Sequence, residues 1–151
     1  MPTIRPCTAN DRAAWLELRQ ALWPEAHADE HGDEIAGLLN EPARFGQFLA
    51  LDDQERALGL IEASIRHDYV NGTDGSPVAF AEGMYVRPDH RQQGVATALM
   101  RAVEAWALEH GCSELASDAA LGNRLSHAVH AGLGFEETER VVFFRKALKG
   151  S

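Results

Sequence analysis

The feature that most constrains this chain is an apolar strand that leads into a long amphipathic helix. Residues 78–86 are rich in β-forming residues, and Val95–Glu109 carries apolar residues at helical spacing. The connecting turn, 91–96, reads RQQGVA, and its Gly94 and Ala96 bring little side-chain bulk. Because the free amides at a helix N-terminus favour a phosphate, the stretch predicts an anion-binding turn.

The turn has a structural interpretation as well. Small residues at a helix start also allow the helix to pack closely on its neighbours. The turn matches neither the P-loop nor the dinucleotide-binding glycine pattern, which excludes those two phosphate sites. Its place between a strand and a long amphipathic helix favours the ligand over packing alone.

The remaining pattern predicts a mixed, mostly antiparallel sheet with about four helices, an α/β (α+β) fold. Helices are expected up to Trp23 and at 31–39, 95–109 and 123–133, and strands at 4–5, 48–51, 57–66, 78–86, 114–117 and 141–144. Strand and helix alternate only in the second half, so a doubly wound fold is excluded. With no linker or repeat, residues 1–151 are expected to form one domain.

Charge and hydropathy exclude several classes of protein. Lys and Arg number 14 and Asp and Glu 23, a net charge of −9, which argues against nucleic acid and suits a cationic partner. No apolar run approaches the roughly 20 residues of a membrane span. The N-terminus lacks the apolar centre of a signal peptide, and two cysteines make no disulfide framework. We therefore expect a cytoplasmic protein without a membrane contact.

The turn resembles the pyrophosphate loop of the GCN5-related N-acetyltransferases, in which Gln or Arg precedes a glycine by three residues. Asn123, followed by a helix and Gly134-Phe135, resembles a second block of that family. The resemblance implies a single N-acetyltransferase domain that uses acetyl-CoA. By matching positions, the cofactor would contact Met84, Tyr85, Val86, Arg91, Gln92, Gln93, Gly94, Val95, Ala96 and Asn123.

One position departs from the family pattern. Many members carry a tyrosine four residues before the Gly-Phe pair, where it protonates the departing thiolate, and this chain has His130. A histidine can donate a proton near neutral pH. We expect His130 either to take that role or to pack on a partly buried helix face.

Three carboxylates are candidates for binding and deprotonating an amine acceptor, which is charged at neutral pH. Glu82 lies inside an apolar strand, where an unpaired charge is costly, so it either serves the site or pairs with an Arg or His across the sheet. Asp118 ends the next strand and serves the site or caps a turn. Glu139 belongs to a charge run before the last predicted strand. We expect Glu82 and Asp118 to be neighbours at the carboxyl ends of their strands.

Longer segments resemble the aminoglycoside 6′-N-acetyltransferases: LRQALWPEA, ASIRHDYVNGTDGSPVAFAEGMYV, ELASD and GFEETERVVFFRK. The resemblance implies an acceptor site with an aromatic floor and acidic walls, made by Trp23, Tyr69, Glu82, Asp118 and Glu139. It also implies direct transfer in a ternary complex. We expect Asp118, or else Glu82, to accept the amine proton and the backbone N–H of Tyr85 to polarise the thioester carbonyl.

Two other functions remain open: acetylation of a polyamine or another small amine, and acyl-CoA binding without turnover. No metal site is expected, because His27 and His31 lack the glutamate of the metalloprotease motif and His127 and His130 lack a third ligand. The apolar run 141–144, together with the resemblance, predicts a homodimer.

Overall fold

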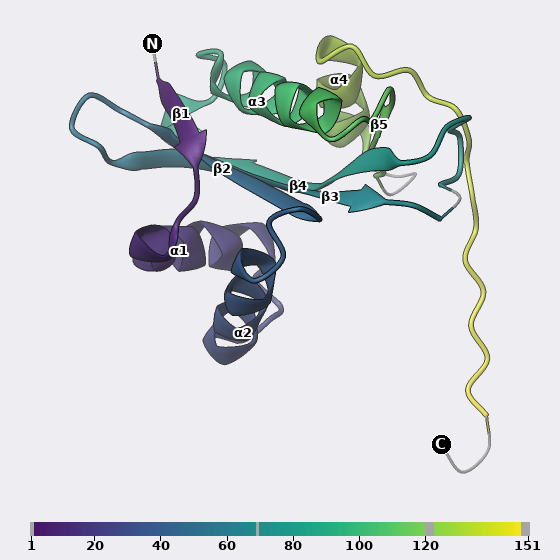
Figure 1. The fold of residues 1–151 in the computed structure, drawn as a ribbon, viewed down its shortest axis with the longest axis horizontal. Helices are drawn as coiled ribbons and strands as arrows, with labels where there is room; N and C mark the ends of the chain where they lie inside the picture. The colour runs from purple at the N-terminus through teal and green to yellow at the C-terminus, as the bar shows by residue number, and fades with distance from the viewer. Residues whose placement is uncertain (1, 69, 120–122, 149–151) are drawn as a thin grey trace. The chain divides into compact units, whose positions relative to one another are not determined.

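The computed structural model describes residues 2–68, 70–119 and 123–148, and it divides into two compact units, Met1–Ser117 and Asp118–Ser151. The first unit contains a five-stranded sheet in the order β1-β2-β3-β4-β5 (Figure 1). Its strands are β1 Thr3–Pro6, β2 Phe45–Leu51, β3 Ala57–Arg66, β4 Val78–Val86 and β5 Leu115–Ala116. Neighbours are antiparallel except β4 and β5, which are parallel. The predicted mixed, mostly antiparallel sheet is confirmed.

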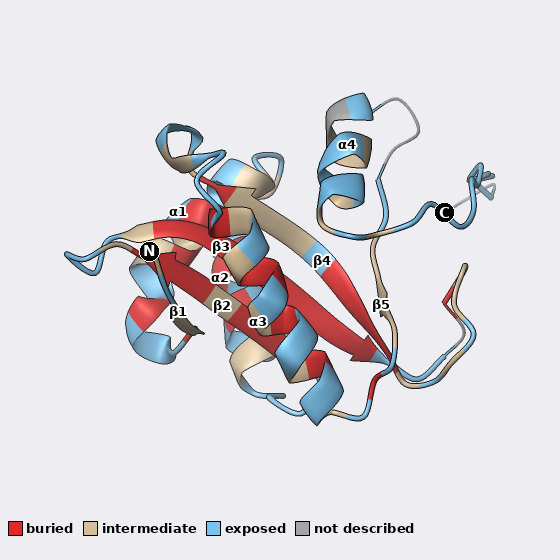
Figure 2. Cartoon of the chain, turned by 90° about the horizontal axis from the view of Figure 1, so that it is seen from above, coloured by how far each residue is buried: buried red, intermediate tan, exposed pale blue. Residues whose placement is uncertain are grey.

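Helices cover both faces of the sheet. α1 (Arg12–Leu22) and α2 (Ala28–Leu39) lie on one face, and α3 (Val95–Glu109) lies on the other (Figure 1). Short 3-10 turns at Ala9–Asp11 and Pro88–His90 precede α1 and α3. Buried residues line the central strands and the inward stripes of the helices (Figure 2). Under α1 and α2 the core contains Cys7, Trp15, Leu18, Ile35, Leu49, Leu51 and Leu60. Burial of each such large apolar side chain contributes about 1.5–3 kcal/mol to the stability of the folded chain.

The middle of β4 carries a β-bulge. Gly83 pairs with Glu62 and Ala81 pairs with Ala63, so that Glu82 is the extra residue. On its other side β4 pairs with β5 only at Ala79 and Phe80. From Glu82 to Val86, no strand in the described part of the chain pairs with that second edge of β4.

The second unit contains α4 (Arg124–Gly132), whose first turn is capped by Asn123: its Oδ1 accepts the N–H of Ser126 at 3.1 Å. The prediction of a last strand at 141–144 was wrong, since these residues form an extended coil (Figure 1). A strand needs a neighbour for its N–H and C=O groups, and the described residues give 141–144 no such ladder. Phe143 and Phe144 are 87% and 93% exposed.

Candidate active site

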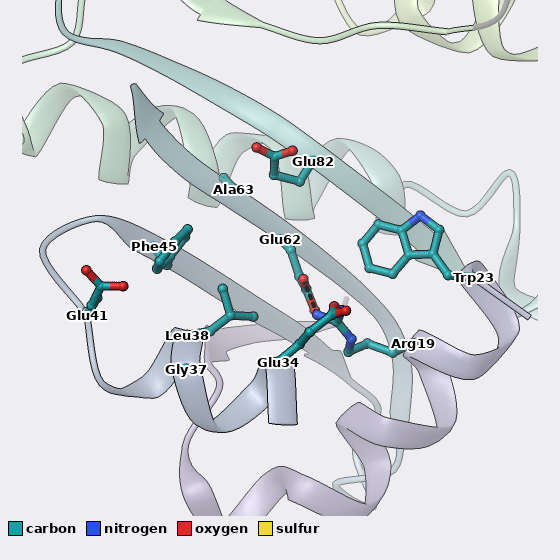
Figure 3. A pocket seen from close by; sticks show the side chains of 10 residues that line it. All are labelled: Arg19, Trp23, Glu34, Gly37, Leu38, Glu41, Phe45, Glu62, Ala63 and Glu82. Atoms are coloured by element: carbon teal, nitrogen blue, oxygen red, sulfur yellow. Dashed lines mark hydrogen bonds and ion pairs between the residues drawn. The ribbon is translucent and has the colours of Figure 1, made fainter. Parts of the chain in front are cut away.

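A cavity of about 570 Å³ opens on the face of the sheet that carries α1 and α2 (Figure 3). Its lining comes from both helices, the turn after α2 and strands β2–β4: Arg19, Trp23, Glu34, Gly37, Leu38, Glu41, Phe45, Glu62, Ala63 and Glu82. Four of these side chains are carboxylates and one is a guanidinium. The cavity wall is therefore acidic and partly aromatic, which suits a cationic ligand with flat or apolar faces.

The floor of the cavity is a buried ion pair. The Nη1 atom of Arg19 lies 2.6 and 2.7 Å from the two carboxylate oxygens of Glu62, and the indole N–H of Trp15 donates to the same carboxylate at 2.8 Å. Arg19 also pairs with Glu34 at the rim. Burial raises the pKa of the Glu62 carboxyl, and Arg19 and Trp15 oppose that rise.

Glu82 pairs with an arginine across the sheet and also lies at the cavity, the two alternatives that its place in the sequence left open. Its carboxylate lines the cavity, and its Oε1 accepts hydrogen bonds from Ser64 Oγ and Arg66 Nη2, each at 2.7 Å. The Arg66 guanidinium lies 3.8 Å from the centre of the Phe80 ring. Among the described residues Oε2 has no hydrogen-bond donor, so this oxygen is left for a ligand.

Trp23 lies at the cavity wall immediately after the last turn of α1 (Figure 3). Its ring packs on β4 at Gly83, and the Arg19 guanidinium lies 4.9 Å from the ring centre. The predicted pair of Trp23 and Glu82 therefore comes together in one cavity. Tyr69, the second predicted aromatic, lies outside the described residues.

The N-terminus of α3 has the features expected of an anion site. Gly94 is its N-cap with a left-handed φ of 83°, and no side chain in the described structure caps this end. A Cβ at Gly94 would meet no atom within 4 Å, so the space beside this residue is open. Arg91 donates from Nε to the Val86 carbonyl at 2.9 Å and lies over the Tyr85 ring. The residues fit a diphosphate.

Along the edge of β4 that does not pair with β3, the backbone groups of every second residue point outward. Arg87 donates its N–H to the Leu58 carbonyl at 2.8 Å, and Tyr85 pairs with Leu60 in the same register. Because backbone direction alternates along a strand, the N–H of Tyr85 faces β3, and those of Met84 and Val86 face the open edge. A backbone donor for an acyl oxygen at this edge therefore belongs to Met84 or Val86, which differs from the expectation for Tyr85.

The other predicted residues belong to the second unit. Asp118 and Glu139 are exposed, and their meeting with Glu82 stays a prediction. Asn123 caps α4, and His130 Nδ1 lies 2.7 Å from the Ser126 carbonyl, with its ring edge on Phe135. Within the described ranges, no three His, Cys, Asp or Glu side chains form a group that could hold a metal ion. No described helix has both the length and the apolar content to cross a membrane.

Sequence reasoning missed Arg19, Glu34, Leu38, Phe45 and Glu62. For Glu62 a signal was present: like Glu82, it is a carboxylate inside an apolar strand, in LGLIEASI. Arg19 and Glu34 carried no comparable signal, because charged residues are common on the exposed faces of helices. Leu38 lies in the helix expected at 31–39, and its place at a cavity depends on how α2 lies on the sheet.

Comparison with known proteins finds similar sequences and structures over nearly the whole chain. The model of the Acetyltransferase (GNAT) family matches residues 12–135. An aminoglycoside N(6′)-acetyltransferase type 1 from Acinetobacter genomosp. 13 is 54% identical over 143 residues, 95% of this chain and 97% of the relative. Two solved structures each have a TM-score of 0.93 and cover 98% of this chain and 99% of their own. One is the aminoglycoside 6′-N-acetyltransferase AAC(6′)-Ih from Acinetobacter baumannii, 49% identical. The other is AAC(6′)-Iy with the bisubstrate analog CoA-S-monomethyl-acetylneamine, 44% identical.

Proposed function

The chain belongs to the GNAT acetyltransferase family, and we propose that it transfers the acetyl group of acetyl-CoA to the 6′-amine of an aminoglycoside. The observation that carries the proposal is the acidic, aromatic-walled cavity formed by Trp23, Glu62 and Glu82 beside the open edge of β4. Relatives of about 50% identity are named for the same reaction. A polycationic sugar needs carboxylates for its ammonium groups and a flat surface for its rings, and this cavity has both.

The cofactor would lie along β4 and the N-terminus of α3. The free amides after Gly94 and the Arg91 guanidinium would hold the diphosphate, and the outward groups of Met84 and Val86 would hold the pantetheine arm. The remaining turn residues, Gln92, Gln93, Val95 and Ala96, and Asn123 complete the predicted contacts. Acetyl-CoA supplies the acetyl group as a thioester.

We assign the proton transfer to Asp118 and ammonium binding to Glu82. Glu82 is already paired through Oε1 with Ser64 and Arg66, whereas the Asp118 carboxylate is exposed. The ammonium first gives one proton to Asp118 through water. The neutral nitrogen then forms a bond to the acyl carbon as the carbon–sulfur bond breaks, and its second proton passes to water. An outward N–H of β4, that of Met84 or Val86, stabilises the charge on the acyl oxygen, and the thiolate leaves with a proton from His130 or water.

We also propose that the protein is a homodimer that pairs the apolar run 141–144 with a second copy. Its four side chains are 47–93% exposed, more than an apolar segment of a monomer keeps. Replacing Phe144 by Asp should halve the mass measured by light scattering, whereas Leu108→Asp, at another exposed apolar residue, should not. A monomeric wild-type protein would contradict the proposal. The reaction would take place in the cytoplasm, where Cys7 and Cys112, both free, stay reduced.

The test of the reaction is purified protein with acetyl-CoA and a panel of amines, followed by release of free thiol. We expect turnover with kanamycin or tobramycin. Turnover with spermidine but with neither antibiotic would replace this acceptor by a polyamine. Acetyl-CoA binding without turnover of any amine would make the protein an acyl-CoA sensor.

A further inference from the structure

His31 links α2 to the end of α1 through both of its ring nitrogens. The residue is 1% exposed, its Nδ1 lies 3.2 Å from Arg19 Nε, and its Nε2 lies 3.1 Å from the carbonyl oxygen of Trp23. Arg19 Nε always carries a hydrogen, so Nδ1 is the acceptor and Nε2–H is the donor. The contacts therefore require the neutral imidazole with its hydrogen on Nε2, which places one buried donor on the Trp23 backbone.

Trp23 borders two cavities. It lines the large one and also a smaller one of about 230 Å³, which is bordered by Arg19, Ala26, His31 and Glu34. The place of its indole is set by Gly83 on one side, by the Arg19 guanidinium, and by the backbone carbonyl that His31 holds.

The end of α1 gives the carbonyl of Trp23 no helical partner. Trp23 follows the last helical residue, Leu22, and its φ of −127° and ψ of 74° take the chain out of the helix. The last carbonyls of a helix need partners outside it. Here the N–H of Ala26 reaches the carbonyl at 3.4 Å and His31 Nε2–H reaches it at 3.1 Å. An α2 side chain thus supplies the shorter of the two bonds that fix the direction in which the chain leaves α1, and with it the origin of the indole.

We propose that His31 is a positioning residue for the acceptor: it sets the Trp23 indole at the wall of the large cavity and so determines affinity for the aminoglycoside. The proposal rests on the proposed function. His31 borders the smaller cavity and is not among the residues that line the large one, so it should affect acceptor binding and leave the acetyl-transfer step and the cofactor site unchanged.

The test compares His31→Gln with His31→Asn. A glutamine amide reaches the position of Nε2 and keeps a donor for the Trp23 carbonyl, whereas asparagine is one methylene shorter and does not. We expect His31→Asn to raise the KM for tobramycin about fivefold, the change that follows loss of one neutral hydrogen bond. The kcat and the KM for acetyl-CoA should stay within twofold, and His31→Gln should restore the wild-type KM. His27→Asn, at the exposed start of the same helix, is the matched control.

Equal KM values for tobramycin in His31→Gln and His31→Asn would overturn the proposal, because the carbonyl bond would then have no effect. A parallel rise in both KM values would show general loosening of the fold and would overturn it as well. Thermal melting of each variant identifies a folding defect. If His31→Asn does not fold, His31→Met takes its place: its side chain has no donor for the Trp23 carbonyl, so its KM for tobramycin should exceed that of His31→Gln, and equal values would overturn the proposal. Absence of tobramycin turnover by the wild-type protein would contradict the proposed function instead.

Discussion

The ring of Trp23 lies directly against the backbone of β4 at Gly83: a Cβ atom built there would come 2.5 Å from Cζ2 of the indole. The glycine therefore determines how deeply the tryptophan sits beside Glu82. A second glycine has the same relationship on the opposite face of the sheet, where a Cβ at Gly46 would come 2.5 Å from Cε2 of Trp106 on α3. The two sites allow the acceptor cavity to be changed separately from the core.

Replacing Gly83 by Ala should push the indole into the cavity and raise the KM for the aminoglycoside about tenfold. Overpacking at this site should also lower the free energy of unfolding by about 1–3 kcal/mol. Gly46→Ala should cause a similar loss of stability with no change in either KM. Steady-state kinetics and urea unfolding measure both effects, and an unchanged aminoglycoside KM in Gly83→Ala would remove Trp23 from the acceptor site.

Replacing Gly94 by Ala should weaken acetyl-CoA binding. Gly94 and Gly111 flank α3 with φ values of 83° and 82°, and neither would bring a Cβ within 4 Å of another atom. Each alanine should cost about 1–2 kcal/mol of stability because of the left-handed backbone. Only Gly94→Ala should raise the KM for acetyl-CoA, by severalfold, because its methyl group would stand in front of the first amides. An equal rise in Gly111→Ala would show that strain alone is responsible.

Replacing Asp118 by Asn should lower turnover at pH 7 at least tenfold, because the amide accepts no proton from the amine. Acetyl-CoA binding, measured by calorimetry, should stay within twofold of wild type. Asp53→Asn, in the exposed turn between β2 and β3, is the control and should change neither value. An unchanged kcat/KM in Asp118→Asn would leave Glu82 as the candidate base.

Replacing Arg19 by Met should leave the buried Glu62 without its cation and lower the free energy of unfolding by about 3–5 kcal/mol at pH 7. Burial raises the pKa of Glu62, and loss of Arg19 removes a charge that opposes the rise. A carboxyl whose pKa is higher in the folded state gains stability as pH falls, so the deficit should shrink toward pH 5. Arg56→Met, which breaks an exposed pair with Asp52, should change the free energy of unfolding far less.

Replacing Asp11 by Asn should remove part of the acid sensitivity of the fold. Hydrogen bonds from Arg5 and Thr8 lower the pKa of Asp11 to about 2. Stability from a depressed carboxyl pKa is present above the unfolded value of about 4 and is lost as pH falls through 2. The variant should therefore be about 1–2 kcal/mol less stable than wild type at pH 7, and this difference should shrink as pH falls toward 2. Urea unfolding at pH 7 and at pH 2 measures the difference in the free energy of unfolding. A difference that does not change with pH would show that ionisation of Asp11 does not contribute to the acid sensitivity.

The local elements were predictable because their signals are local. The bounds of β3, β4 and α3 agree with those expected from apolar spacing and from the glycines and prolines at their ends. The start of α2 was placed three residues late, since Ala28, Asp29 and Glu30 form an exposed first turn without large apolar residues. The prediction of a strand at 141–144 was wrong. An apolar run indicates that a segment is able to form a strand, but it does not indicate whether a neighbouring strand is there to pair with it.

The site was predictable where a residue type was out of place and unpredictable where only packing brings residues together. Glu82 in an apolar strand and Trp23 off the apolar stripe of its helix both lie at the cavity. The link from His31 to Trp23 joins residues eight apart across the bend between α1 and α2, and no periodicity encodes it. The direction of the Tyr85 amide likewise depends on the strand register, which a single sequence does not contain.

The extra residue at Glu82 has a consequence for how this protein tolerates insertions and deletions. In a regular strand consecutive side chains point to opposite faces, yet Glu82 lines the cavity and its neighbour Gly83 meets the indole on the same side. Removing Glu82 would restore strict alternation and leave both flanks in register with β3, because Ala81 and Gly83 already pair with the consecutive residues Ala63 and Glu62. A one-residue deletion here would therefore take the carboxylate out of the cavity and keep the sheet, whereas a deletion elsewhere in β4 would turn the side chains on one side of the cut to the opposite face.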